Sequence, residues 1–255
     1  MHQTDPERIG ACFRRSIKSY DRSATVQAAI GNRLVALIKQ FCGVAFCRVL
    51  EVGCGTGLTT GALCRHAELG LLCLNDLVPE CCERAAEKAK NAETRCVLMP
   101  GNIETVQPPP DLDLIFSSST FQWLSDLPGC LAKFHDSLNP GGYLVFSMLG
   151  PKTMFQVRAL TGVGLSYPDQ KELKAMMHHG FVVDFIEAVN YTLFFPTPRE
   201  VLRHIRETGV GGVAPFRWTR SRLKRFEQRY NAFFSDQRGV ALDYSAIFAV
   251  ARKNG

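Results

Sequence analysis

Three glycines at alternate positions, Gly53, Gly55 and Gly57, directly follow a short apolar run at residues 49–52. Glycine adopts positive φ angles without strain, and it allows a ligand to approach the main chain where a Cβ atom would collide. A helix-like stretch at residues 58–66 comes next, so the N–H groups of the turn would point toward a ligand at a helix N-terminus. The spacing therefore predicts a strand–turn–helix unit that binds a nucleotide-like cofactor; an ordinary tight turn is the alternative.

Two acidic residues narrow the class of cofactor. A dinucleotide-binding turn has the pattern G-x-G-x-x-G, whereas Leu58 occupies the sixth position here. Glu51 at the end of the strand would repel a pyrophosphate, but it could hold a cationic amine. Asp76 closes the next apolar run, where a carboxylate accepts hydrogen bonds from ribose hydroxyls. The alternative role for Asp76 is that of an N-cap for a helix starting near Pro79.

Polar residues also end the fourth predicted strand, at residues 112–117. Ser118 and Ser119 would then lie beside the glycine turn, at the topological switch point where doubly wound sheets bind ligands. Gln122 and Trp123 follow, and we expect them to line a substrate pocket; a plain core position is the alternative for Trp123.

The composition excludes several classes of protein. The chain has 255 residues, of which 46% are hydrophobic, so it can bury a sizeable core. No apolar run approaches the roughly 20 residues that span a bilayer, and residues 1–19 lack the apolar segment of a secretory signal. The ten cysteines show no zinc-site spacing, which favours free thiols in a reducing cytoplasm and predicts no metal site. Cys54, in the glycine turn, is interpreted as a small filler rather than a nucleophile.

The net charge of +6 is concentrated in one segment. Residues 196–230 contain nine Lys or Arg against three Glu, an excess equal to the net charge of the whole chain. A concentrated basic surface favours an anionic partner, for which nucleic acid, a membrane surface and an acidic protein are the candidates.

Helical and apolar segments alternate from residue 48 to residue 148. Strands are expected at 49–52, 71–74, 96–99, 112–117 and 143–148, with helices at 58–66, 80–91 and 127–138. Such β-α-β alternation predicts a parallel sheet covered by helices on both faces. Helices are expected before it at 9–19 and 24–41, with Asp21 as N-cap of the second. After residue 150 we expect helices at 152–160, 169–179, 198–207 and 219–230, a strand at 181–195 broken near Asn190, and a last strand at 244–252.

The form E-x-G-x-G-x-G of residues 51–57 resembles motif I of the class I S-adenosylmethionine methyltransferases. Residues 138–144 similarly resemble the L-x-P-G-G-x-L turn of that class, which is structural. The resemblance implies S-adenosylmethionine as cofactor, S-adenosylhomocysteine as product, and a contact of Asn102 with the adenine amino group. The residues expected around the cofactor are Tyr20, Glu51, Gly53, Cys54, Gly55, Thr56, Gly57, Asp76, Leu77, Asn102, Ile103, Ser118 and Ser119.

Other segments resemble one family within that class, the malonyl-acyl-carrier-protein O-methyltransferases of biotin synthesis (the BioC family). They are residues 13–27, 121–123, 146–153 with Arg158, 202–210, 223–230 and 244–253. The resemblance implies an α/β, Rossmann-like sheet of seven mostly parallel strands in a single methyltransferase domain, 1–255. An N-terminal helical lid, 1–42, and helical cap insertions, 150–180 and 196–240, would complete it.

The family's reaction transfers a methyl group to the free carboxylate of a malonyl thioester, which is already ionised at pH 7 and needs no strong base. Arg158 is the expected cationic clamp for that carboxylate, and Tyr20 is expected to close over the reacting groups. An acidic acyl carrier protein would bind the basic segment 196–230, with no membrane and no nucleic acid involved. A methyltransferase for small polycarboxylates or quinones, and an assembly factor or hydroxylase without methyl transfer, remain alternatives.

Overall fold

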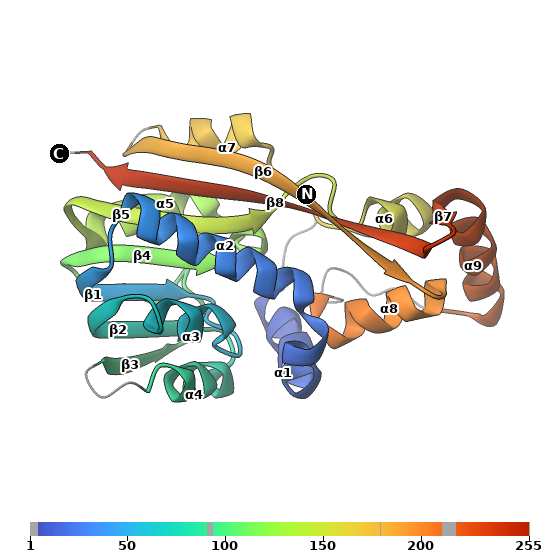
Figure 1. Ribbon diagram of the computed structural model, residues 1–255, viewed down its shortest axis with the longest axis horizontal. Helices are drawn as coiled ribbons and strands as arrows, with labels where there is room; N and C mark the ends of the chain where they lie inside the picture. Colours follow the sequence, from blue (N-terminus) through green and yellow to red (C-terminus); the bar gives the residue numbers. More distant parts are fainter. Residues whose placement is uncertain (1–4, 91–93, 179, 211–217, 255) are drawn as a thin grey trace.

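A central sheet organises the computed structural model of the protein (Figure 1), which describes residues 5–90, 94–178, 180–210 and 218–254. The strand order is β3-β2-β1-β4-β5-β8-β6, and the two-residue strand β7 pairs with β8. The strands are β1 (Ala45–Val52), β2 (Glu68–Asp76), β3 (Arg95–Pro100), β4 (Leu112–Ser118), β5 (Leu138–Leu149), β6 (Phe181–Phe195), β7 (Ser235–Asp236) and β8 (Gly239–Lys253). Strands β1 to β5 are parallel, and β8 pairs antiparallel with both β5 and β6. The predicted mostly parallel sheet is thereby confirmed.

Apolar layers cover both faces of the sheet. Successive β1 residues alternate between them: Val49 joins the core with α2 (Thr25–Phe41), α3 (Leu58–Cys64) and α4 (Pro79–Lys88). Leu50 joins the opposite core, with α5 (Leu127–Ser137) and α7 (Gln170–Met177). Burial on both faces explains why these strands are continuous apolar runs rather than alternating ones.

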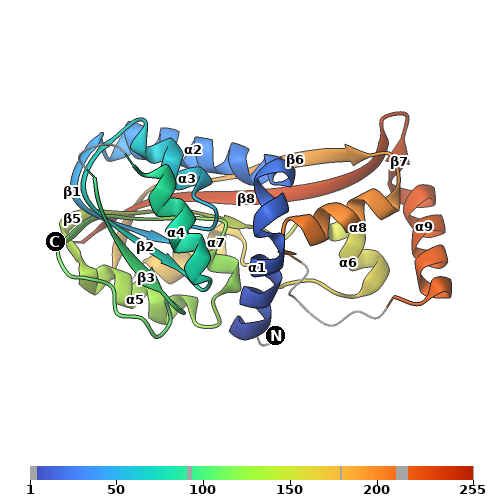
Figure 2. The same ribbon diagram turned by 90° about the horizontal axis from the view of Figure 1, so that it is seen from below.

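Two long strands carry the remaining helices away from the sheet. β6 and β8 contain 15 residues each, so they span about 50 Å at roughly 3.3 Å per residue. Beyond the sheet they run beside α6 (Phe155–Thr161), α8 (Pro198–Glu207) and α9 (Arg220–Phe234) (Figures 1 and 2). α8 and α9 occupy the stretch between β6 and β8 where helices were expected.

Two expectations about single elements are wrong, and two more fall outside the described residues. β6 does not break at Asn190, which pairs with Ser245 in regular register; the irregularity falls between Val183 and Phe185. Asp21 is not an N-cap, because α1 (Pro6–Ser23) runs past it and Ala24 caps α2 without a side-chain hydrogen bond. Expected helix ends at residues 91 and 179 lie outside the described residues.

The segment expected as a first cap insertion, 150–180, divides between two places. Its first part, with α6, contacts α9 and β8 away from the sheet's centre. Its second part, α7, packs Leu173 and Met177 into the core that α5 shares. Asp169 begins α7 through a reciprocal capping box with Glu172.

Candidate functional site

A cleft lies where the parallel strands end, against the glycine turn. Ten of the thirteen expected cofactor residues line it: Tyr20, Gly53, Gly55, Thr56, Asp76, Leu77, Asn102, Ile103, Ser118 and Ser119. Glu51, Cys54 and Gly57 are the three that do not. The carboxyl ends of neighbouring parallel strands meet at one edge of a sheet, which explains how residues from distant parts of the sequence converge.

The three glycines of the turn have different roles. All have positive φ angles, of 70°, 54° and 80° for Gly53, Gly55 and Gly57. A Cβ at Gly53 would lie 2.1 Å from Oγ1 of Thr120, and one at Gly57 would lie 2.6 Å from Cα of Ala85 on α4. At Gly55 the same space is open, and Gly55 lines the cleft. Gly57 is therefore required for packing of the turn on α4, whereas Gly55 leaves room for a ligand beside the main chain.

Asp76 connects the cleft with the turn. Its Oδ2 accepts a hydrogen bond of 2.9 Å from the N–H of Gly55, and its Oδ1 accepts one of 2.9 Å from the N–H of Val78. Burial raises the pKa of Asp76 to about 6, while these two bonds lower it, so the group remains mainly ionised at pH 7. A carboxylate at this edge is suited to ribose hydroxyls, and the ribose contact stays a prediction. The N-cap position of α4 belongs to Val78, not to Asp76.

Asn102 and its neighbours provide the other wall. Asn102 Oδ1 accepts a hydrogen bond of 3.0 Å from the N–H of Glu104, which fixes the side chain at the cleft. Leu77 and Ile103 add apolar surface. The carboxylate of Asp76, the amide of Asn102 and the aliphatic side chains of Leu77 and Ile103 together fit an adenosine moiety. The contact of Asn102 with the adenine amino group stays a prediction.

Glu51 lies below the turn rather than in the cleft. Its side chain is 1% exposed and accepts a hydrogen bond of 2.5 Å from Thr60 Oγ1. Burial raises the pKa of Glu51 to about 8, so the carboxyl is mainly protonated at pH 7. Glu51 is not among the residues that line the cleft, so its expected contact with a cationic amine stays a prediction.

The titration of Glu51 predicts a pH-dependent stability. The folded-state pKa lies above the ordinary value of 4.5, so the free energy of unfolding falls as pH rises from about 4.5 to about 8. The side chain of the variant Glu51→Gln cannot ionise. We therefore expect its free energy of unfolding, relative to that of the wild type, to rise by roughly 2–4 kcal/mol between pH 5 and pH 8.5. Urea unfolding of both proteins at each pH measures this difference. Parallel pH curves would contradict it, and Glu83→Gln, an exposed site on α4, is the matched control.

The helix α1 lines one side of the cleft and is called the lid below, after the expected N-terminal lid, whose function stays a prediction. Its side chains at residues 9, 13, 16, 17 and 20 line the cleft, a spacing that places them on one helical face. Asp21 accepts hydrogen bonds from Thr56 Oγ1, in the glycine turn, and from Lys88 Nζ at 2.7 Å. Asp21 and Phe13 were not expected at the site; the apolar spacing of residues 9, 13 and 17 was the available signal.

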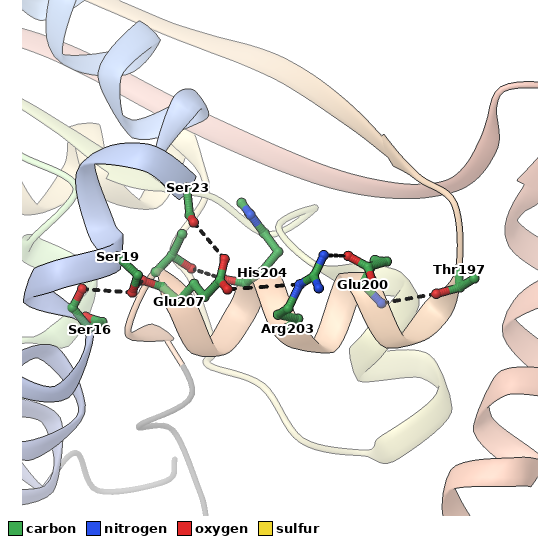
Figure 3. A network of polar contacts seen from close by, with 9 residues as sticks. Ser16, Ser19, Ser23, Thr197, Glu200, Arg203, His204 and Glu207 are labelled. Carbon is green, nitrogen blue, oxygen red and sulfur yellow. Dashed lines mark hydrogen bonds and ion pairs between the residues drawn. The ribbon is translucent and has the colours of Figure 1, made fainter.

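The lid is also held by the cap helix α8 (Figure 3). Ser19 Oγ donates a hydrogen bond of 3.1 Å to the main-chain oxygen of Glu207, and Ser23 Oγ donates one of 2.8 Å to Glu207 Oε2. His204, on the same helix, bonds Tyr244 of β8 at 2.8 Å. The position of the lid is therefore linked to that of α8 and β8.

A second cavity of about 580 Å³ lies on the other side of the lid. Arg158 of α6 lines it and donates a hydrogen bond of 2.6 Å to the main-chain oxygen of Pro151. Trp123 lines both this cavity and the cleft, and packs edge-to-face on Phe13 at 5.7 Å. Gln122 lines neither; it bonds the oxygen of Ser119 and the N–H of Leu149. Trp123 thus belongs to the lining of both cavities, whereas Gln122 stabilises the loop that carries Trp123.

The strand order, with a glycine turn and an acidic strand end at the carboxyl edge, defines a class I methyltransferase. A sequence profile described as "Methyltransferase domain" matches residues 50–146. A putative methyltransferase from Bacillus halodurans superposes with a TM-score of 0.63 at 13% identity, over 87% of this chain and 99% of that one. The N-methyltransferase NodS from Bradyrhizobium japonicum, in complex with S-adenosyl-L-homocysteine, gives 0.53 at 15% identity, over 88% and 86%. These structures show the fold, and S-adenosylmethionine is the cofactor of the class.

Closer relatives define the family. The malonyl-[acyl-carrier protein] O-methyltransferase of Chlorobium phaeovibrioides is 37% identical, over 96% of this chain and 95% of its own length. The enzyme of the same name from Bacteroides thetaiotaomicron is 33% identical, over 96% and 97%. The chain belongs to the malonyl-[acyl-carrier protein] O-methyltransferase family, within the S-adenosylmethionine-dependent O-methyltransferases.

Proposed function

We propose that the protein transfers the methyl group of S-adenosylmethionine to the free carboxylate of a malonyl group carried by an acyl carrier protein, an early step of biotin synthesis. The observation that carries the proposal is the second cavity, which meets the cofactor cleft at Trp123 and is lined by Arg158. Among the residues that the structure describes, no Asp or Glu lines this cavity, so it suits an anionic acceptor. The names of the relatives agree with this choice of acceptor.

The reaction neutralises charge. A carboxylate oxygen attacks the methyl carbon and forms the O–CH₃ bond, while the C–S bond breaks and its electron pair remains on sulfur. An anion and a sulfonium become a neutral ester and a thioether, so exclusion of water from the site favours the step. The protein has to align the two groups rather than remove a proton.

Two side chains would provide the alignment. Arg158 can bind the carboxylate through two parallel N–H groups, which fixes the plane of the attacking oxygens. Tyr20 lies in the cleft lining of the lid, and burial raises the pKa of its phenol above the ordinary range. The phenol therefore stays neutral at pH 7 and can donate a hydrogen bond while its ring covers the reacting groups.

The direct test is methyl transfer from labelled S-adenosylmethionine to malonyl-carrier protein, followed by intact mass. A gain of one methyl on the acyl group is expected. Free malonate, free polycarboxylates and acetyl-carrier protein serve as alternative acceptors in the same assay. Tight cofactor binding without transfer to malonyl-carrier protein would refute the proposal, and equal transfer to free polycarboxylates would favour the small-molecule alternative.

The basic segment is proposed to bind the acidic carrier through α9. All three glutamates of residues 196–230 pair with Arg199 or Arg203 on α8. Five further basic residues of this segment lie on α9 and are exposed; they are Arg220, Arg222, Lys224, Arg225 and Arg229. Arg217 lies outside the described residues. Complementary charge steers the encounter of such partners and is screened by salt.

We expect the KM for malonyl-carrier protein to rise about fivefold between roughly 50 and 300 mM KCl, because the Debye length shrinks over this range. The double variant Lys224→Ala, Arg225→Ala should flatten this dependence. Arg252→Ala removes a charge beside Asp184, at the far end of β8, and is the matched control. Steady-state kinetics across the salt series measures the effect, and a KM that is insensitive to salt would refute carrier docking on α9.

The location of the protein is proposed from its thiols. All ten cysteines are free, including six that are buried. No helix among the described residues is long and apolar enough to cross a membrane. Free buried thiols are typical of a reducing compartment, so we propose the cytoplasm.

A further inference from the structure

The lid helix α1 presents a second face, opposite to the one that covers the cofactor cleft. Arg8, Ala11, Cys12 and Arg15 line the large cavity, and their spacing of i, i+3, i+4 and i+7 places them on one stripe. One helix therefore contributes side chains to both cavities, which meet at Trp123. The side chains of α1 that line the cleft do not line the large cavity. Trp123, which belongs to a different segment, lines both.

The large cavity is lined by three positively charged side chains. They are Arg8, Arg15 and Arg158, and within the described part of the chain no Asp or Glu lines the cavity. Among the residues that the structure describes, none of these three guanidinium groups forms an ion pair. Nη2 of Arg15 donates a hydrogen bond of 3.0 Å to the thiol Sγ of Cys12. One malonyl carboxylate can pair with one of the three charges, which leaves the other two for a further anion.

The size of the cavity leads to the same conclusion. A volume of about 580 Å³ is in the range of pockets that enclose drug-sized ligands, far more than a malonyl group occupies. The lining is otherwise mainly apolar, with Leu149, Val157, Leu202 and Ile205 among its side chains. Such a space suits an extended, flexible arm that carries anionic groups. The malonyl group of a carrier protein is attached through this kind of arm, which ends in a phosphodiester.

We propose that Arg8 and Arg15 form a subsite for the phosphodiester of the carrier's prosthetic arm, while Arg158 holds the carboxylate at the other end. This proposal rests on the proposed function. Arginine binds phosphate oxygens through parallel N–H groups, and Arg15 is exposed, so it lies where an arm attached to a protein would enter. A phosphate bound there would also hold α1 over the cofactor cleft, because the same helix forms both walls.

The test compares two small acceptors without the carrier protein: malonyl-pantetheine and malonyl-4′-phosphopantetheine. For the wild type we expect the phosphate to lower KM about tenfold, with kcat within about twofold. In the double variant Arg8→Gln, Arg15→Gln the two KM values should converge. Arg14→Gln, whose side chain instead pairs with Glu80 at 3.0 Å, should retain the tenfold difference.

Each outcome supports or refutes the subsite. The subsite is supported if the two KM values converge in the double variant but not in Arg14→Gln. Unchanged binding of S-adenosylhomocysteine, measured by calorimetry, shows that the double variant is folded. An unchanged tenfold ratio in the double variant, or equal KM values for the two acceptors in the wild type, overturns it. Failure of the wild type to methylate any malonyl thioester would instead be a failure of the proposed function.

Discussion

Replacing Arg158 by alanine is expected to lower kcat/KM for malonyl-carrier protein at least about 100-fold, with the Kd for S-adenosylhomocysteine within about twofold. Two charge-assisted hydrogen bonds to the carboxylate would be lost, at about 1.5–3 kcal/mol each, and tenfold corresponds to about 1.4 kcal/mol. Arg158 lines the large cavity and not the cofactor cleft, which is why the two measurements should separate. Steady-state kinetics and calorimetry provide them.

A neighbouring glycine allows a finer test of the same clamp. A Cβ at Gly164 would lie 2.8 Å from Cδ of Arg158, so Gly164→Ala should displace the guanidinium without removing it. We expect an intermediate loss, about tenfold, and Arg158→Lys should lose nearly as much as alanine because an ammonium cannot bind bidentately. Arg252→Ala is the control far from both cavities. Wild-type kinetics for Arg158→Ala would exclude the clamp.

The sheet and the cofactor edge were predictable because they depend on local patterns. Apolar runs followed by Gly53, Asp76, Asn102 or Ser118 give strand ends, and parallel strands bring those ends to one edge. No such rule places Glu51: its carboxyl is buried and accepts a hydrogen bond from Thr60, the third residue of α3.

The errors arose where tertiary contacts overrode local signals. Asp21 has the residue type of an N-cap, but its partners Thr56 and Lys88 stabilise it inside α1, and they are distant in sequence. Asn190 suggested a break, yet it is exposed at a position where β6 alternates between exposed and half-buried residues, so it costs the strand little.

The second cavity could not be predicted from the sequence. Its walls come mainly from α1, from residues 149–167 and from α8, which are far apart in the sequence and meet only in the fold. Arg158 was identified from the resemblance alone, and Arg8 and Arg15 were not identified. The two-sided pattern of α1, apolar at 9, 13 and 17 and basic at 8 and 15, was the signal in the sequence.

Replacing Gly53 by alanine is expected to weaken binding of S-adenosylhomocysteine at least about 100-fold. The residue has φ of 70°, which costs an L-residue about 1–2 kcal/mol. Its new Cβ would also lie 2.1 Å from Oγ1 and 2.7 Å from Cβ of Thr120, so the turn and the loop after β4 must move apart. Both segments line the cleft, so the displacement changes its shape directly. Calorimetry measures the affinity, and urea unfolding measures the accompanying loss of stability.

Gly141→Ala separates backbone strain from this crowding. Gly141 has φ of 75°, but nothing lies within 4 Å of the position of its Cβ, and it lies in the irregular first part of β5, outside the cleft lining. We expect it to lose about 1 kcal/mol of stability with normal affinity for S-adenosylhomocysteine. All three atoms nearest to the Gly53 position belong to the Thr120 side chain, so Gly53→Ala combined with Thr120→Gly should recover part of the lost affinity. If Gly53→Ala binds as tightly as the wild type, or if the second substitution recovers nothing, crowding against Thr120 is not what requires glycine in the turn.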